Sequence, residues 1–199
     1  MSSDSAKAYE RHAREFLRAR DEGSIGVGIV EGWSRSLAPG IDVLEIACGG
    51  GLPVTQTLVS SGLMVWAVDS STTLLASFQS RFPGIPVQCA RIQESNYFGR
   101  KFGAIVSIGL IFLLDEEDQL ALIRSVSEHL LPGGRFLFTA PIEEATWIDL
   151  ITGHDCTSLG RERYESALQK SGLQLTGTYM DEGNNSYYDA RLAPREPPT

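Results

Sequence analysis

Short apolar stretches alternate with amphipathic stretches between residues 41 and 141, and this alternation limits the possible folds more than any other feature of the sequence. The apolar stretches have the length of buried strands, and the amphipathic stretches carry apolar residues at helical spacing. Strands that alternate with helices form a mainly parallel sheet with both faces covered. Strands are predicted at 41–47, 63–68, 85–90, part of 104–112 and 135–140, with helices at 52–61, 71–82 and after Asp115.

The flanking segments add helices at one end and a hairpin at the other. Apolar residues fall at helical spacing in 9–17 and again in 25–37, which predicts two N-terminal helices. A further helix is predicted at 159–171, and two alternating stretches joined by a turn at 181–185 predict a C-terminal antiparallel hairpin. No linker or repeat interrupts the chain, so residues 1–199 are expected to form one domain with an unstructured tail at 193–199.

Charge and cysteine content exclude several classes of function. The net charge is -8 and no Lys/Arg cluster is present, so a polynucleotide substrate is disfavoured. No apolar run approaches the roughly 20 residues of a membrane span, and the N-terminus has no apolar signal-peptide core. Cys48, Cys89 and Cys156 form no CxxC pair, so no metal site is indicated, and a cytoplasmic location with reduced thiols is the simplest interpretation.

The stretch 42–51, DVLEIACGGG, leads the first predicted strand into three consecutive glycines. Glycine is costly to order, so such a tract indicates a sharp turn or the close approach of another group to the backbone. In open parallel sheets, ligands bind beyond the carboxyl ends of the strands, where the strand order reverses. The glycine tract lies at the carboxyl end of the first strand, and this end is therefore the predicted crevice.

Two cofactor classes compete for this crevice. A dinucleotide fold requires G-x-G-x-x-G, but only Gly49-x-Gly51 is present and Val54 occupies the third position. Glu45 opposes a pyrophosphate, because like charges repel in a poorly solvated cleft, and it suits a cationic ligand instead. S-adenosylmethionine carries a sulfonium, an ammonium and a ribose diol, and Asp69 at the end of the second strand is placed to accept protons from that diol.

At this point the sequence resembles the class I S-adenosylmethionine-dependent methyltransferases. VLEIACGGG resembles their first motif and AVDSS the second, while FGAIVSIGLIFLL and HLLPGGRFLFTAP resemble the fourth- and fifth-strand regions in the expected order. The resemblance implies an α/β fold of three Rossmann-like layers, with a mainly parallel seven-strand sheet and a C-terminal antiparallel hairpin. It implies an N-terminal helical lid (1–40), a cofactor-binding core (41–141), and an acceptor loop, last helix and hairpin (142–192).

The resemblance also implies a set of cofactor-binding residues. Two departures from the family pattern affect this set: Ala47 stands where the family has its first glycine, and no acid directly follows the third strand, where Glu94 is the nearest candidate. Turn formation remains an alternative for the glycines, helix capping for Asp69, and core packing for Ile108 and Tyr9. The expected residues are Tyr9, Glu45, Ala47, Gly49, Gly51, Asp69, Ser70, Ile92, Gln93 and Ile108.

The catalytic requirement is modest. Methyl transfer is an in-line displacement at carbon, and much of its acceleration comes from holding the acceptor and the sulfonium in line. A general base is needed only if the acceptor must lose a proton near that step. His154 is the candidate, since it follows the fifth strand, whereas His12 and His129 fall on predicted helices. Trp147 is a candidate for the acceptor pocket, with packing as the alternative.

The resulting hypothesis is methylation of a small-molecule acceptor, because little chain lies outside the core to recognise a large one. One alternative is a Rossmann-type NAD(P)-dependent oxidoreductase or epimerase, which would use a Tyr-x-x-x-Lys motif that this chain lacks. Another is a non-catalytic cofactor-binding module. No nucleic acid or membrane partner is expected, and a homodimer is left open.

Overall fold

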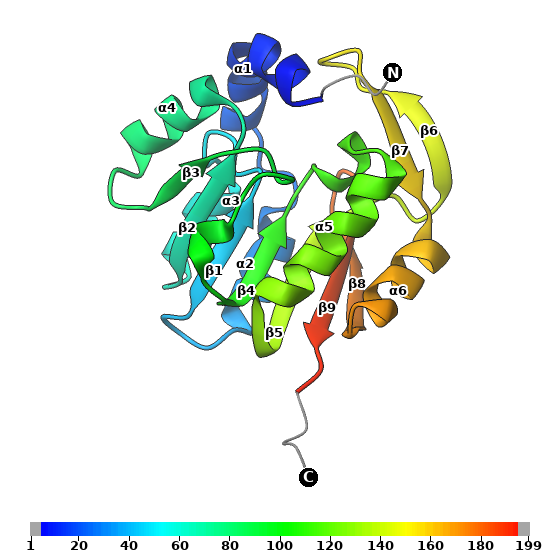
Figure 1. Ribbon diagram of the computed structural model, residues 1–199. Helices are drawn as coiled ribbons and strands as arrows, with labels where there is room; N and C mark the ends of the chain where they lie inside the picture. The colour runs from blue at the N-terminus through cyan, green and yellow to red at the C-terminus, as the bar shows by residue number, and fades with distance from the viewer. Residues whose placement is uncertain (1–4, 195–199) are drawn as a thin grey trace.

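The computed structural model describes residues 5–194, and it confirms the predicted fold (Figure 1). Seven strands form one sheet in the order β3-β2-β1-β4-β5-β9-β8. The first five strands are parallel, and β9 runs antiparallel to both β5 and β8. Their bounds are β1 Asp42–Ile46, β2 Met64–Asp69, β3 Val87–Cys89, β4 Phe102–Ser107, β5 Leu130–Thr139, β8 Leu173–Met180 and β9 Ser186–Leu192.

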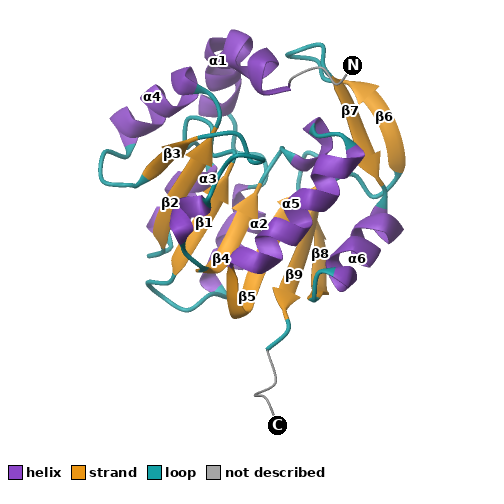
Figure 2. Cartoon of the chain, in the orientation of Figure 1, coloured by secondary structure: helices purple, strands orange, loops and turns teal. Residues whose placement is uncertain are grey.

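Helices cover both faces of the sheet and give three layers (Figure 2). On one face, α5 (Glu116–His129) and α6 (Arg161–Lys170) pack against side chains such as Ile105 and Phe138. On the other, α2 (Val27–Arg35) and α3 (Val54–Ser60) pack against Val43 and Leu137, with α4 (Thr72–Arg81) beside them on β2. Because both faces are buried, the central strands are mainly apolar rather than alternating, and Glu45 in β1 is a buried polar residue among them.

Side-chain caps fix where two helices begin. The Asp115 carboxylate accepts a hydrogen bond from the Asp118 backbone N–H, as the acidic run predicts, and so caps α5. The Ser71 hydroxyl accepts from the Leu74 backbone N–H and caps α4. Ser71 therefore performs the capping that was the alternative role for Asp69.

Three details differ from the sequence-based prediction. The segment 142–160, expected as a loop, contains a separate hairpin of β6 (Glu144–Ile148) and β7 (Asp155–Leu159). The Pro132-Gly133-Gly134 turn lies within β5, because α5 has already ended at His129. The predicted strand over part of 104–112 ends at Ser107 and is followed by a short 3-10 turn. Of the predicted tail at 193–199, residues 195–199 lie outside the described residues.

Helix α1 (Ser5–Asp21) lies across the carboxyl edge of the sheet, and the β6–β7 hairpin lies at the same edge farther along (Figure 1). The Glu10 carboxylate accepts hydrogen bonds from the Ser71 and Thr73 hydroxyls at the start of α4. At the other end of α1, Arg81 forms a two-pronged ion pair with Asp21, at 2.8 and 2.6 Å. These contacts hold α1 over the edge where the crevice is predicted.

Candidate functional site

A cavity of about 370 Å³ opens at the carboxyl edge of the sheet, beneath α1. It lies beside the ends of β1 and β4, which are neighbours at the point where the strand order reverses. The structure brings nine of the ten expected cofactor-binding residues to its wall. These nine are Tyr9, Glu45, Ala47, Gly49, Asp69, Ser70, Ile92, Gln93 and Ile108.

Gly51, the tenth, does not line the cavity. Its φ is +87°, and a Cβ added there would lie 2.4 Å from a ring carbon of Phe82. Gly51 is therefore a packing glycine, since both its backbone conformation and the nearby ring exclude a side chain. This is the turn-glycine alternative that the sequence left open.

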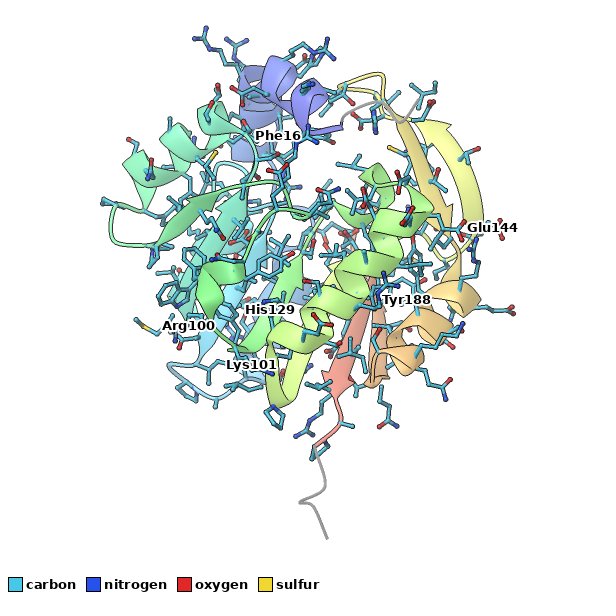
Figure 3. All side chains as sticks on the ribbon, in the orientation of Figure 1. Phe16, Arg100, Lys101, His129, Glu144 and Tyr188 are labelled. Atoms are coloured by element: carbon cyan, nitrogen blue, oxygen red, sulfur yellow. The ribbon has the colours of Figure 1, made fainter. Side chains whose placement is uncertain are left out.

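The other two glycines of the tract are covered by α1. A Cβ at Gly49 would lie 3.1 Å from the Phe16 ring, and one at Gly50 would lie 2.3 Å from a methyl group of Leu17. Phe16 projects from α1 on the side that faces the sheet (Figure 3). Side chains of α1 therefore make the close approach to the Gly49 and Gly50 backbone. Gly49 also adopts the left-handed backbone conformation, with φ +57°.

Ala47 adopts the left-handed backbone conformation, with φ +61°. Its N–H donates to the Val68 carbonyl oxygen at 2.8 Å, so the turn that a glycine would form is kept. A left-handed L-residue costs about 1–2 kcal/mol, which this turn tolerates because the surrounding strands fix it. The departure from the family pattern therefore leaves the shape of the tract intact.

The Asp69 carboxylate is buried at the end of β2, where it holds the glycine tract in place. Its Oδ2 accepts the Gly49 N–H and its Oδ1 accepts the Ser71 N–H, each at 2.8 Å. Burial raises the pKa of Asp69 above its ordinary value, and these backbone hydrogen bonds oppose that rise. Each oxygen retains acceptor capacity for a further donor.

Glu45 lies one strand away and is 4% exposed. Its Oε2 accepts the Thr55 hydroxyl at 2.6 Å, and its Oε1 makes no hydrogen bond to any residue that the structure describes. Burial raises the pKa of Glu45 to about 8. A buried carboxyl that is costly to ionise favours a cationic partner, because such a partner stabilises the charged form.

The segment after β3 supplies the wall where the adenine was expected. Ile92 and Gln93 line the cavity, and the Gln93 side-chain amide donates to Asp118 at 2.6 Å. Glu94 does not line it, so no acid stands at the position where the family often has one. Ala90 and Arg91 line the same wall, so it offers apolar contact, the polar Gln93 side chain and the Arg91 side chain to a base.

His154, the candidate base, does not line the cavity. Its side chain is 7% exposed, and its Nε2 lies 3.3 Å from the Leu113 carbonyl oxygen beneath the β6–β7 hairpin. Trp147 does not line the cavity either, but it packs against Phe112, which does, with ring centroids 5.4 Å apart. Trp147 therefore supports the wall rather than forming it.

Sequence reasoning missed several residues of the cavity wall. Arg20 is not among the expected residues, yet it lines the cavity. It follows Tyr9, Ala13 and Phe16 on the same stripe of α1, and this continued helical spacing is the signal that could have indicated it. The other missed residues come from the 3-10 turn after β4, the β6–β7 hairpin and the C-terminal hairpin. They include Phe112, Asp149, Ile151, Asp181, Asn185 and Tyr187.

Two negative findings bear on other kinds of site. Among residues 5–194, no group of three or more His, Cys, Asp or Glu side chains is placed to hold a metal ion. None of the helices that the structure describes combines the length and the apolar character needed to cross a membrane.

Comparisons with known proteins agree with this geometry. A family model described as a methyltransferase domain matches residues 43–134. A cypemycin N-terminal methyltransferase from a Streptomyces species is 28% identical over 174 residues, which covers 80% of this chain and 68% of that protein.

Among solved structures, magnesium protoporphyrin IX methyltransferase from Synechocystis PCC 6803 with bound S-adenosylmethionine superposes with a TM-score of 0.77 at 14% identity. The match covers 96% of this chain and 99% of that one. The glycopeptide N-methyltransferase MtfA with S-adenosylhomocysteine superposes with a TM-score of 0.70 at 21% identity, over 91% and 97% of the two chains.

The matched domain contains the glycine tract, the end of β2 and the end of β4, which form part of the cavity wall. The nicotinamide-dependent alternative is therefore not retained. The chain therefore resembles the class I S-adenosylmethionine-dependent methyltransferases in its matched domain and in its fold, and the comparisons indicate a methyltransferase that uses S-adenosylmethionine.

Proposed function

We propose that this protein transfers the methyl group of S-adenosylmethionine to a compact small-molecule acceptor bound in the same cavity. One observation carries the proposal: the expected cofactor residues at the ends of β1, β2 and β4 share one cavity with a second wall from the β6–β7 and C-terminal hairpins. A volume of about 370 Å³ for the whole cavity favours a small acceptor group.

We assign the cofactor end from the positions of its side chains. Asp69 accepts the ribose hydroxyls, since each of its oxygens already makes one hydrogen bond and can make another. Glu45 faces the ammonium group with its unengaged Oε1. Ile92 and Gln93 contact the adenine, Ile108 and Ser70 border the nucleoside, and Tyr9 covers it from α1.

The cofactor supplies an activated methyl group, whose transfer leaves a neutral thioether. The chain's contribution is to bind, to orient and to exclude water. Helix α1 and the β6–β7 hairpin enclose the cavity from above, and the end of β4 fixes its floor. Holding the acceptor atom in line with the methyl carbon converts a bimolecular reaction into an effectively unimolecular one, which can account for about 7–11 kcal/mol of the barrier. No general base is assigned, because His154 lies outside the cavity.

The acceptor end favours an amine. Asp149 and Asp181 both line it. Burial acts to raise the pKa of Asp181, but hydrogen bonds from Asn185, Tyr187 and the backbone outweigh it and lower the pKa below its ordinary value. An ionised carboxylate attracts a protonated amine and disfavours an acidic acceptor. The amine must release its proton to water or to one of these carboxylates before its nitrogen lone pair can attack the methyl carbon. Two of the relatives described above are named as N-methyltransferases, one of a peptide N-terminus and one of a glycopeptide, which supports the same acceptor class.

The experiment is an acceptor screen that detects S-adenosylhomocysteine. Primary amines are paired with alcohols and carboxylic acids of the same carbon skeleton, and each is incubated with the protein and S-adenosylmethionine. We expect turnover with amines and none with the matched acids, and Asp149→Asn and Asp181→Asn are expected to reduce it. Turnover with alcohols or acids in preference to amines would refute the acceptor class, and turnover on large polymers alone would refute a compact acceptor.

A further inference from the structure

Two carboxylates at the acceptor end differ in their capacity to take the proton that an acceptor ammonium must lose before its nitrogen can attack. Asp149 belongs to the turn of the β6–β7 hairpin, and Asp181 belongs to the turn between β8 and β9. Both side chains line the cavity. Their existing hydrogen bonds distinguish the two.

The Asp181 carboxylate is occupied by its own turn. Its Oδ1 accepts hydrogen bonds from the Gly183 and Asn185 backbone N–H groups, each at 2.9 Å, and from the Asn185 side-chain amide at 3.1 Å. Its Oδ2 accepts the Tyr187 hydroxyl at 2.9 Å and the same amide at 3.0 Å. A carboxylate offers about four lone-pair sites, so these contacts leave Asp181 no site for a ligand.

The Asp149 carboxylate is fixed on one oxygen and open on the other. Its Oδ2 accepts hydrogen bonds from the Thr152 backbone N–H at 2.9 Å and from the Thr152 hydroxyl at 2.6 Å. Its Oδ1 makes no hydrogen bond with any residue between positions 5 and 194. The Thr152 contacts therefore hold the group in one orientation, while the second oxygen keeps its full acceptor capacity.

The ionisable side chains that face Asp149 from α1 and β7 are Tyr9 and Cys156. Burial, and after it the charge of Asp149, raises the pKa of Tyr9 above its ordinary value and the pKa of Cys156 to about 11. Both groups therefore stay neutral near pH 7. Arg20, a cation of α1 on the same cavity wall, acts on the pKa of Tyr9 in the opposite direction.

The Tyr9 hydroxyl is a second open polar group beside Asp149. Tyr9 lines the same cavity, and its hydroxyl makes no hydrogen bond with any residue that the structure describes. The other ionisable groups of the hairpin lie elsewhere, since the His154 ring lies against a carbonyl oxygen of the 3-10 turn and Asp155 is exposed. An open carboxylate oxygen and an open hydroxyl, from two different elements, are thus directed at one end of the cavity.

We propose that Asp149 is the catalytic carboxylate that takes the proton of the acceptor ammonium, with the Tyr9 hydroxyl as a second contact of the nitrogen. Asp181 is a positioning residue that fixes Asn185 and Tyr187 on the cavity wall. This inference rests on the proposed function, since it concerns the same amine acceptor.

The step balances in atoms and charge. One N–H proton passes to Oδ1 of Asp149, and its bonding electron pair stays on the nitrogen. That pair forms the bond to the methyl carbon, while the pair of the broken carbon–sulfur bond stays on sulfur. The products are a methylated ammonium, a neutral thioether and a protonated Asp149, which then returns its proton to water.

A pH profile separates the roles of the two carboxylates. Asp149→Asn keeps an oxygen for the Thr152 donors and removes the base, and Asp181→Asn is the matched substitution. For each variant, kcat/KM for benzylamine, or for the amine that the acceptor screen selects, is measured at saturating S-adenosylmethionine from pH 6.5 to 8.5 and divided by the native value. We expect the Asp149→Asn ratio to rise about tenfold per pH unit, because this variant must receive an amine that has already lost its proton to water. The Asp181→Asn ratio should stay constant within about twofold.

Two measurements without turnover complement the profile. Calorimetric titration of benzylamine into protein saturated with S-adenosylhomocysteine should show a loss of about tenfold or more for Asp149→Asn, about fivefold for Tyr9→Phe and less than about threefold for Asp181→Asn. Urea denaturation should show the reverse order for the two carboxylates. Asp181→Asn should lower the midpoint more than Asp149→Asn does, because its amide would face the Asn185 and Tyr187 donors.

The outcomes separate this inference from the function on which it rests. A ratio for Asp149→Asn that does not change with pH would overturn it, as would a ratio that rises for Asp181→Asn instead. If no amine is methylated and none binds the loaded protein, the proposed amine acceptor itself fails, and the inference fails with it.

Discussion

Replacing Glu45 with Gln removes a buried ionisable group and keeps an acceptor for the Thr55 hydroxyl. Burial raises the pKa of Glu45 from 4.5 to about 8. Between pH 4.5 and pH 8, Glu45 is therefore protonated in the folded protein and ionised in the unfolded chain. The stabilisation from that proton is fully present below pH 4.5 and is lost as the pH rises through 8. One pKa unit corresponds to about 1.4 kcal/mol, so the whole interval amounts to about 5 kcal/mol.

Urea denaturation of the native protein and of Glu45→Gln at pH 5, 6, 7, 8 and 9 measures this effect. The difference in unfolding free energy, native minus variant, is expected to fall by about 1.4 kcal/mol per pH unit up to about pH 8 and then to level off. Titrating groups that do not interact with Glu45 cancel in the difference. A difference that stays constant from pH 5 to pH 8 would refute the raised pKa and the burial on which it depends.

The same group makes cofactor binding depend on pH. The ammonium of S-adenosylhomocysteine binds the ionised form of Glu45, so the apparent affinity of the native protein should rise as the pH approaches 8, by up to about tenfold per unit. Glu45→Gln should bind more weakly and with little dependence on pH over the same range. Calorimetry in two buffers of different ionisation enthalpy should also detect a proton released on binding to the native protein at pH 7.

Three further substitutions test separate parts of the structure. Gly51→Ala should destabilise the protein by about 2–4 kcal/mol in the same denaturation assay, because it combines a left-handed backbone with a steric clash. Gly62→Ala, at a residue with φ +78° and open space around it, should cost only about 1 kcal/mol, and equal losses for the two variants would contradict the packing role of Gly51. Asp69→Ala should fold but lose about 100-fold in S-adenosylhomocysteine affinity by calorimetry, and retained tight binding would remove Asp69 from the site. Arg135→Met should lower the free energy of unfolding by about 3–5 kcal/mol, because the Asp189 carboxylate, which is 1% exposed, loses its ion-pair partner. A decrease of less than about 1 kcal/mol would show that the pair contributes little to stability.

The fold could be predicted because its information is local. Apolar stretches of strand length, the Asp115 cap and the glycine tract each lie within a few residues of the element that they define. The β6–β7 hairpin was missed because the residues of β6 are mostly exposed and show no alternation of apolar and polar side chains. Without a buried face, a strand leaves little signal in the sequence.

The site was less predictable because its walls come from segments distant in the chain. Gly51 has the spacing of a cofactor glycine, but Phe82 at the end of α4 covers it, and that contact depends on tertiary packing. Arg20 reads as a surface residue until α1 is placed across the carboxyl edge of the sheet. The acids of the acceptor end, Asp149 and Asp181, fall in two turns that only the folded chain brings to one cavity.

The central claim is that the cavity beneath α1 binds S-adenosylmethionine with its ribose on Asp69 and its amino acid group beside Glu45. A crystal structure of the native protein grown with S-adenosylhomocysteine tests it most directly. The account predicts density for the nucleoside between the ends of β1 and β4, with both ribose hydroxyls within hydrogen-bonding distance of the Asp69 carboxylate. Nucleoside density at any other place, or a cavity that holds only solvent at saturating ligand, would contradict it.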